Sequence, residues 1–393
     1  MLGRCLLLIL FLSSCAKLEP TLPEDDSLLD GPMEGLSGEE RARFIRGDLA
    51  FNDEIFHAGN GLGPLFVATS CGSCHAGDGP GHPFSTLTRF GQVDATGNLY
   101  LDQGGPQLQH RAIPGAQPEI IPAGASSSQF LPPLNTGLGF LDAVSDMDIM
   151  TFADENDLDG DGISGRPNWV VRKGYSPERP GSVQQASLYM GRFGRKAGAF
   201  DLLQQTASAY NQDIGVVSTF EPVDPYTGEE QDPEVLTATI HDVVFYLRTL
   251  KAPLQREPDN AEVIAGEAIF MDMGCGKCHR AEMTTGESPI AALANKTFRP
   301  FTDLLMHDMG PGLDDGYTEG SALTSEWRTP ALWGLGLFPD SQGGGYFLMH
   351  DGRAHSIEEA IGLHGGEGAA ARDVFNALNA SDRVRLLHFL ESL

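Results

Sequence analysis

The chain has 393 residues, which is long enough for two domains with sizeable cores. Its formal net charge of −28 argues against binding to nucleic acid, because the phosphates would repel such a surface. An acidic surface is suited to attract a basic redox partner, but it also serves simply to keep a protein soluble, and charge alone leaves both roles open.

The first residues have the pattern of an export signal. Arg4 precedes a short apolar run, and residues 12–15 (Leu-Ser-Ser-Cys) have the form of a lipoprotein cleavage site. This pattern predicts a signal peptide over residues 1–14, with cleavage before Cys15 and acylation of that residue. The run is too short to cross a membrane. We therefore expect a protein held by lipid on the periplasmic side, at the outer membrane; an ordinary secretory signal and a soluble periplasmic protein are the alternative.

The next segments predict a tether and a first helix. Residues 15–38 are rich in Pro, Gly, Asp and Glu, which predicts a flexible tether. A helix is expected from about Glu39, and residues 47–51 within it (Gly-Asp-Leu-Ala-Phe) resemble residues 266–270 (Gly-Glu-Ala-Ile-Phe). This weak internal repeat indicates two related units, each with a helix followed by a loop.

Later elements suggest where the chain divides. Apolar residues with helical spacing predict a helix over residues 236–250. Pro253 and Pro258 follow, so residues 251–259 are the expected domain boundary. A closing helix is expected from Ser381, which is a good N-cap.

Two Cys-x-x-Cys-His motifs carry the most specific chemical information. In this motif two thiols bind the vinyl groups of haem covalently, and the histidine ligates the iron. A thioredoxin-like dithiol or half of a zinc site can share the spacing, but a zinc site would need further Cys or paired His nearby. We therefore predict two haem c groups. Their attachment and proximal ligand residues are Cys71, Cys74, His75, Cys275, Cys278 and His279.

These features predict a mainly α fold with two cytochrome c-like haem domains, long loops and large insertions. The expected domains are residues 39–252 and 258–393. The high content of glycine, 48 residues, and of proline, 25 residues, indicates much loop, as expected where haem rather than a sheet fills the core.

Beyond the motifs, the chain resembles the bacterial di-haem oxidoreductase family of peroxidase-like proteins, which are related to the di-haem cytochrome c peroxidases. The segments that carry this resemblance are residues 159–169, 191–194, 302–310, 326–330, 350–354 and 364–367. The chain departs from the family at Arg195, where a Trp is expected, so an aromatic electron relay through that position is in doubt.

The resemblance implies different roles for the two haems. The second haem would transfer electrons, with Met349 as its second axial ligand, because the related peroxidases have a Met at the matching place; a thioether ligand raises the reduction potential. Met306, Met309 and His307 are rival ligands in the same region, and His307 is expected instead to form hydrogen bonds within a loop.

The first haem would be the peroxidatic one, with an open iron. Met147, Met150 and His82 are poorly placed along the chain to close it. The related peroxidases use a Gln and a Glu ten residues apart beside this haem, and Gln109 and Glu119 have that spacing. The resemblance therefore implies that Gln109 and Glu119 are catalytic; an exposed loop position for Glu119 is the alternative.

An acidic segment has part of a calcium-binding pattern. Asp157, Asp159 and Asp161 alternate before Gly162, as at the start of an EF-hand loop. The twelfth position is Asn168 instead of a bidentate Glu, which would weaken binding. Calcium and a solvated acidic turn are both compatible with this sequence.

The expected function is a di-haem oxidoreductase that reduces hydrogen peroxide, or a related oxidant, with electrons from a small donor protein such as a cytochrome c or a cupredoxin. A pure electron-transfer cytochrome is one alternative. An oxidase that modifies a partner protein is another.

Overall fold

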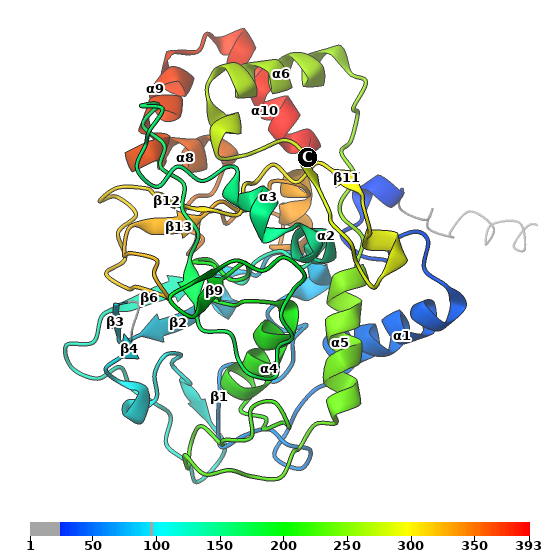
Figure 1. The fold of residues 1–393 in the computed structure, drawn as a ribbon, viewed down its shortest axis with the longest axis vertical. Helices are drawn as coiled ribbons and strands as arrows, with labels where there is room; N and C mark the ends of the chain where they lie inside the picture. Colours follow the sequence, from blue (N-terminus) through cyan, green and yellow to red (C-terminus); the bar gives the residue numbers. More distant parts are fainter. Residues whose placement is uncertain (1–23, 95–96) are drawn as a thin grey trace, which may run out of the picture.

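The computed structural model describes residues 24–94 and 97–393 (Figure 1). The predicted signal peptide and Cys15 lie outside these residues. About one-third of the chain is helical and the strands are short, in agreement with the mainly α prediction. Within the described part, no helix is both long and apolar enough to cross a membrane. The division into two cytochrome c-like domains stays a prediction.

The α-helices are α1 (Gly38–Asp48), α2 (Leu138–Ala143), α3 (Asp146–Met150), α4 (Leu202–Asp213), α5 (Thr237–Thr249), α6 (Ala261–Asp272), α7 (Phe338–Ser341), α8 (Ile357–Gly362), α9 (Ala369–Ala377) and α10 (Ala380–Ser392). The strands are β1 (Leu65–Phe66), β2 (Leu87–Phe90), β3 (Gln92–Asp94), β4 (Gly97–Asn98), β5 (Arg111–Ala112), β6 (Ser127–Phe130), β7 (Trp169–Val170), β8 (Gln184–Gln185), β9 (Leu188–Met190), β10 (Met283–Thr284), β11 (Thr297–Phe298), β12 (Met306–Asp308) and β13 (Glu326–Arg328). All pairings are antiparallel: β1–β5, β2–β6, β3–β4, β10–β11 and β12–β13 form two-stranded sheets, and β9 lies between β7 and β8.

The first helix pair is formed by α1 and α5, which cross in close contact (Figure 1). Gly47 lies at this crossing. A Cβ atom added there would overlap the carbonyl oxygen of Asp242 and come within 2.6 Å of Tyr246 Cβ. Because these two α5 residues are four apart, they lie on one face of that helix, and only glycine allows the backbones to approach so closely.

The second helix pair, α6 and α10, repeats this packing at the other end of the molecule (Figure 1). A Cβ atom added at Gly266 would overlap the carbonyl oxygen of Arg385 and lie 2.7 Å from Phe389 Cβ. These partners are again four residues apart. The internal repeat predicted from the sequence is therefore confirmed as a repeated helix crossing.

The cores connect the two halves of the chain. One core cluster centres on α1, α4 and α5, and a second on α6, α8, α9 and α10. A third contains residues from both sides of residues 251–259, among them Leu141, Met190, Leu305 and Trp333. Residues that precede and follow this segment therefore share one apolar cluster.

Part of the predicted tether packs against the fold. Leu29, Met33 and Leu36 are buried, and the Met33 amide donates a hydrogen bond to the Thr249 carbonyl, 2.8 Å away. The flexible-tether prediction is therefore wrong for residues 29–36, because these three apolar side chains are enough to fix the segment beside the end of α5.

Of the other predicted elements, one helix is confirmed and the start of another is corrected. The helix predicted over residues 236–250 is confirmed as α5, and residues 251–259 contain neither helix nor strand. Ser381 is wrong as the N-cap of the closing helix: Asn379 takes this role, and its side chain accepts a hydrogen bond from the Asp382 amide at 3.0 Å. Asn is as good an N-cap as Ser, so composition could not separate the two positions.

Candidate haem sites

The first motif forms a tight turn that holds His75 half-buried. The amides of Cys74 and His75 both donate to the Cys71 carbonyl, at 3.0 and 3.1 Å. The imidazole lies 5.9 Å from the ring of Phe51, which follows Gly47 by one helical turn. Burial lowers the pKa of His75 to about 4, so the ring is neutral and can ligate a metal. The Nδ1 atom of His75 is buried and has no hydrogen-bond partner of good geometry. The Pro133 carbonyl is the polar group that acts on this ring, and it partly opposes the lowering of the pKa of His75.

The second motif repeats this arrangement. The His279 amide donates to the Cys275 carbonyl at 2.9 Å, and the His279 ring lies 6.2 Å from Phe270, one turn after Gly266. Burial lowers the pKa of His279 to about 4. Its Nδ1 lies 2.9 Å from the Phe301 carbonyl. Because a neutral ring must donate its proton to that oxygen, Nε2 keeps the lone pair that iron needs.

The thiols are unlike those of a redox-active dithiol. Burial raises the pKa of Cys71 to about 12, of Cys74 to about 11 and of Cys275 to about 12. Catalytic dithiols instead have a lowered pKa, because the thiolate is the nucleophile. The pKa values therefore argue against a thioredoxin-like use of these motifs.

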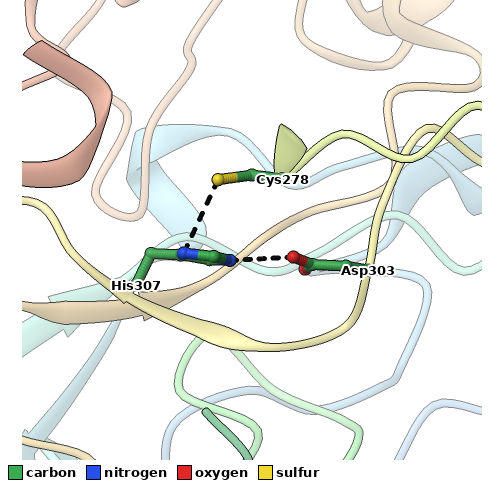
Figure 2. Close-up of side chains that lie close together, drawn as sticks. All are labelled: Cys278, Asp303 and His307. Atoms are coloured by element: carbon green, nitrogen blue, oxygen red, sulfur yellow. Dashed lines mark hydrogen bonds and ion pairs between the residues drawn. The ribbon is translucent and has the colours of Figure 1, made fainter. Parts of the chain in front are cut away.

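Beside the second motif, Cys278, Asp303 and His307 lie close enough together to suggest a metal site (Figure 2). His307 Nε2 lies 2.8 Å from Asp303, and its Nδ1 lies 2.6 Å from Glu367 and 3.5 Å from Cys278 Sγ. Burial lowers the pKa of His307, but hydrogen bonds with Asp303, Cys278 and Glu367 outweigh this and raise it well above the usual value. A protonated imidazole has no lone pair for a metal, so the cluster is an ion-paired clamp.

The hydrogen bonds expected for His307 are confirmed, but this residue lies on strand β12 and not in a loop. The two carboxylates that hold it were not predicted. Asp303 and Glu367 lie in residues 302–310 and 364–367, both within the segments that resemble the family, and this was the available signal.

A cavity of about 270 Å³ lies against the second motif. Its lining is mainly apolar and includes Cys275, Cys278, His279 and Met349. Met349 therefore faces the same space as the proximal histidine, which a second axial ligand requires. Of the rivals, Met309 also lines the cavity, whereas Met306 is buried outside the lining. The assignment of Met349 as iron ligand stays a prediction.

Gln109 and Glu119 lie together. The Glu119 carboxylate accepts a hydrogen bond from the backbone amide of Gln109 at 2.6 Å. The backbone amide of Glu119 donates to the backbone carbonyl of Gln109 at 3.1 Å. Burial raises the pKa of Glu119 to about 7, so this carboxyl can exchange a proton near neutral pH. Glu119 is half-buried, unlike an ordinary exposed loop residue.

This pair is linked to the first motif through the end of α4. The side-chain Nε2 of Gln109 donates to the backbone carbonyl of Gln212 at 3.0 Å. The side-chain Oε1 of Gln109 is buried without a partner. Asp213, which follows Gln212 and ends α4, contributes by its charge to the raised pKa of both Cys71 and Cys74. The unpartnered oxygen can accept a hydrogen bond. The catalytic role of the pair stays a prediction.

The acidic loop differs in part from the EF-hand pattern. Carboxylate oxygens of Asp157 and Asp159 lie close together with one from Asp154, but Asp161 forms an ion pair with Lys277, 3.0 Å away. Lys277 lies inside the second motif, so the loop docks beside the second haem site. Asn168, the twelfth position, is fully buried and binds backbone groups. Calcium binding stays a prediction, with Asp154 a better placed partner than Asp161.

The tryptophans occupy different environments. Trp327 and Trp333 line the cavity beside the second motif, and Trp333 also packs with Trp169 in the third core cluster. Trp327 stacks on His350, with the ring centres 3.6 Å apart, and Lys196 Nζ lies 3.8 Å from the centre of the same ring.

A family model and several solved structures match this chain. Hydrazine synthase from Kuenenia stuttgartiensis aligns over 96% of this chain and 95% of its own, at 14% identity and a TM-score of 0.40. A MauG-like protein associated with microbial copper homeostasis aligns over 66% of this chain and 89% of its own, at 13% identity and a TM-score of 0.33. Both scores are too low to carry an argument about this chain, and no curated protein sequence matches it.

The family model described as "di-haem oxidoreductase, putative peroxidase" matches residues 131–393. The chain therefore belongs to the di-haem oxidoreductase family.

Proposed function

We propose that the chain is a di-haem c-type cytochrome that reduces hydrogen peroxide with electrons from a small redox protein, such as a cytochrome c or a cupredoxin. The overall reaction is H₂O₂ + 2 e⁻ + 2 H⁺ → 2 H₂O. When bound, haem c supplies an iron that accepts and passes on single electrons and, where its sixth position is open, takes peroxide. The thiols and histidines of the two motifs would hold both groups.

The observation that carries this proposal is the repeated unit around the two histidines. His75 and His279 are both half-buried and neutral, and each packs against a Phe that follows a helix-crossing glycine by one turn. Two similar environments for two Cys-x-x-Cys-His motifs fit two haems of one kind.

The remaining residues divide between the two sites. Met349, in the cavity with His279, suits the electron-transfer site. Glu119, whose pKa of about 7 allows proton exchange, suits the peroxidatic site, where it would take a proton from the inner oxygen of peroxide and return it to the leaving oxygen. Gln109 would orient the peroxide through its free Oε1.

The proposed location is the periplasmic side of a membrane, with acylated Cys15 as the anchor, because c-type haem is attached outside the bacterial cytoplasm. A calcium ion held by the acidic loop would fix this loop beside the second motif. The acidic surface would attract a basic donor protein.

Stopped-flow mixing tests this function against its rivals. The fully reduced protein should be reoxidised by hydrogen peroxide, with one peroxide consumed for each two electrons. A reduced protein that stays reduced with excess peroxide would favour the pure electron carrier. Peroxide consumption that leaves small donor proteins reduced but oxidises a partner protein would favour the protein-modifying oxidase.

Replacing Met349 by Leu should open the iron of the second haem and lower its midpoint potential, because a thioether ligand favours the ferrous state. Redox titration with optical spectra of both haems measures this. Met306→Leu is the matched control, since Met306 lies outside the cavity lining. Unchanged spectra and potentials in Met349→Leu would instead transfer the ligand role to Met309.

A further inference from the structure

Two arginines face the second haem cavity without an acidic partner. Arg195 and Arg328 both line it, and neither forms an ion pair within the described chain. Arg195 Nε donates to the Leu131 carbonyl at 2.8 Å, and Arg328 Nε donates to the Gly194 carbonyl at 3.0 Å. Arg195 Nη2 also donates to the Pro132 carbonyl at 3.5 Å, and Arg328 Nη1 to the Thr329 carbonyl at 3.2 Å. Each guanidinium is thus oriented by two backbone oxygens and keeps further N–H groups for another acceptor.

The carboxylates that act on these arginines are engaged elsewhere. Asp351 attracts Arg195 but pairs with Arg353 at 2.7 Å, and Asp303 attracts Arg328 but pairs with His307. Burial lowers the pKa of both arginines to about 10, and in Arg195 the charge of Arg328 adds to this effect. Both side chains are half-buried, and two like charges that are partly removed from water are costly unless an anion compensates them.

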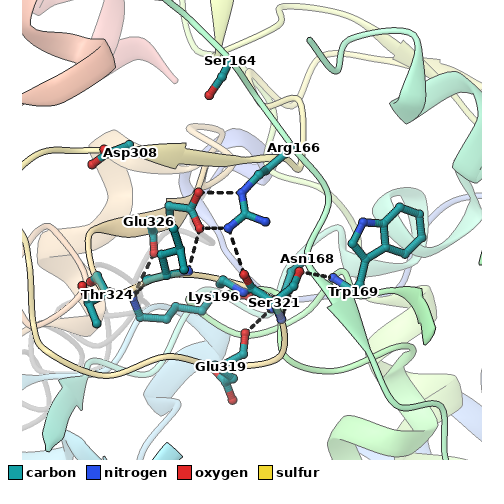
Figure 3. Close-up of polar contacts among 12 residues, drawn as sticks. Ser164, Arg166, Asn168, Trp169, Lys196, Asp308, Glu319, Ser321, Thr324 and Glu326 are labelled. Carbon is teal, nitrogen blue, oxygen red and sulfur yellow. Dashed lines mark hydrogen bonds and ion pairs between the residues drawn. The ribbon is translucent and has the colours of Figure 1, made fainter. Parts of the chain in front are cut away.

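The arginines are fixed by their neighbours along the chain. The Arg328 amide donates to the Arg195 carbonyl at 3.1 Å, which joins β13 to residues 194–196. Figure 3 shows the polar contacts that hold this junction: Arg166 forms an ion pair with Glu326, and Lys196 Nζ donates to the Glu326 carbonyl at 3.0 Å. Arg195 and Arg328 are therefore preorganised to bind a ligand.

We propose that Arg195 and Arg328 bind the carboxylate groups of the haem that is held by Cys275, Cys278 and His279. This inference rests on the proposed function, because haem is the anion that this function brings to the cavity. Guanidinium groups match carboxylates with paired, charge-assisted hydrogen bonds.

Midpoint potentials test the proposal in the mature di-haem protein. Arg195→Gln and Arg328→Gln should each lower the potential of the Met-ligated haem, because losing a cation stabilises the ferric form. We expect about a tenfold change in the reduction equilibrium, about 59 mV for a one-electron couple. The haem carboxylate bending bands in resonance Raman spectra should shift in the same variants, which a purely structural role would not cause.

Two variants separate charge from shape and from bulk effects. Arg195→Lys keeps the charge and should retain the potential but still shift the carboxylate bands, and it serves if the Gln variants fold poorly. Arg385→Gln removes a cation from the exposed surface of α10 and should change neither readout. Unchanged potentials and bands in both cavity variants, or an equal shift in Arg385→Gln, would overturn the proposal. Protein without covalent haem would overturn the proposed function as well.

Discussion

Replacing Glu119 by Gln should lower peroxide turnover by about 10²–10⁴-fold, the usual contribution of a positioned acid–base group. The substitution keeps the size of the side chain but removes the carboxyl whose pKa burial raises to about 7. Because Glu119 must first accept a proton, wild-type turnover should rise as the pH increases through about 7. The variant should lose this dependence. Steady-state peroxide consumption between about pH 5 and 8 measures both effects.

Glu234→Gln is the matched control for this variant. Glu234 also accepts a backbone hydrogen bond, from the Val217 amide at 3.1 Å, and burial also raises its pKa. Its replacement should leave turnover and pH dependence unchanged. Haem content and the potential of the Met-ligated haem should stay at wild-type values in Glu119→Gln. Wild-type turnover in that variant would remove Glu119 from the mechanism, and loss of haem would make its role structural.

Replacing Gly266 by Ala should destabilise the protein by about 1–3 kcal/mol, the usual cost of overpacking a close contact. Alanine in a helix is otherwise favoured over glycine by about 1 kcal/mol. Here the added Cβ would overlap the Arg385 carbonyl and lie 2.7 Å from Phe389, so α6 and α10 would have to separate. Denaturant unfolding followed by circular dichroism measures the change in free energy of unfolding.

The repeated crossing supplies a second test, and α8 supplies a control. Gly47→Ala should cost a similar free energy, because its added Cβ would meet α5 in the same way. Gly362→Ala lies in the same half of the chain as Gly266, and a Cβ there would contact nothing within 4 Å. It should be neutral or stabilising. If Gly266→Ala were equally stable, the close crossing of α6 and α10 would be wrong.

The local patterns in the sequence predicted local features well. The spacing of apolar residues identified α5, and the resemblance of residues 47–51 to 266–270 identified the repeated unit, because each depends on contacts that recur within a few residues. Met349 and His279 share a cavity although 69 intervening residues separate them, and only the family resemblance suggested this pair.

Contacts between distant segments were not predictable in this way. Arg195 and Arg328 are held near each other because residues of β13 are hydrogen-bonded to residues 194–196, and nothing near either residue in the sequence indicates these contacts. The packing of Leu29 and Met33 was hidden for the same reason, since their acidic and proline-rich surroundings resemble a free tether. Only the fold shows what each side chain meets.

The mass of the denatured protein, purified from cells that attach haem to c-type cytochromes, tests the central claim most directly. Both histidines are half-buried and neutral, and each packs against a Phe, so both motifs should carry covalent haem. The expected mass exceeds that of the mature chain by two haems, and a Cys275→Ala, Cys278→Ala double variant should retain one. A mass excess of one haem or none in the wild-type protein would contradict the assignment of two haem c sites.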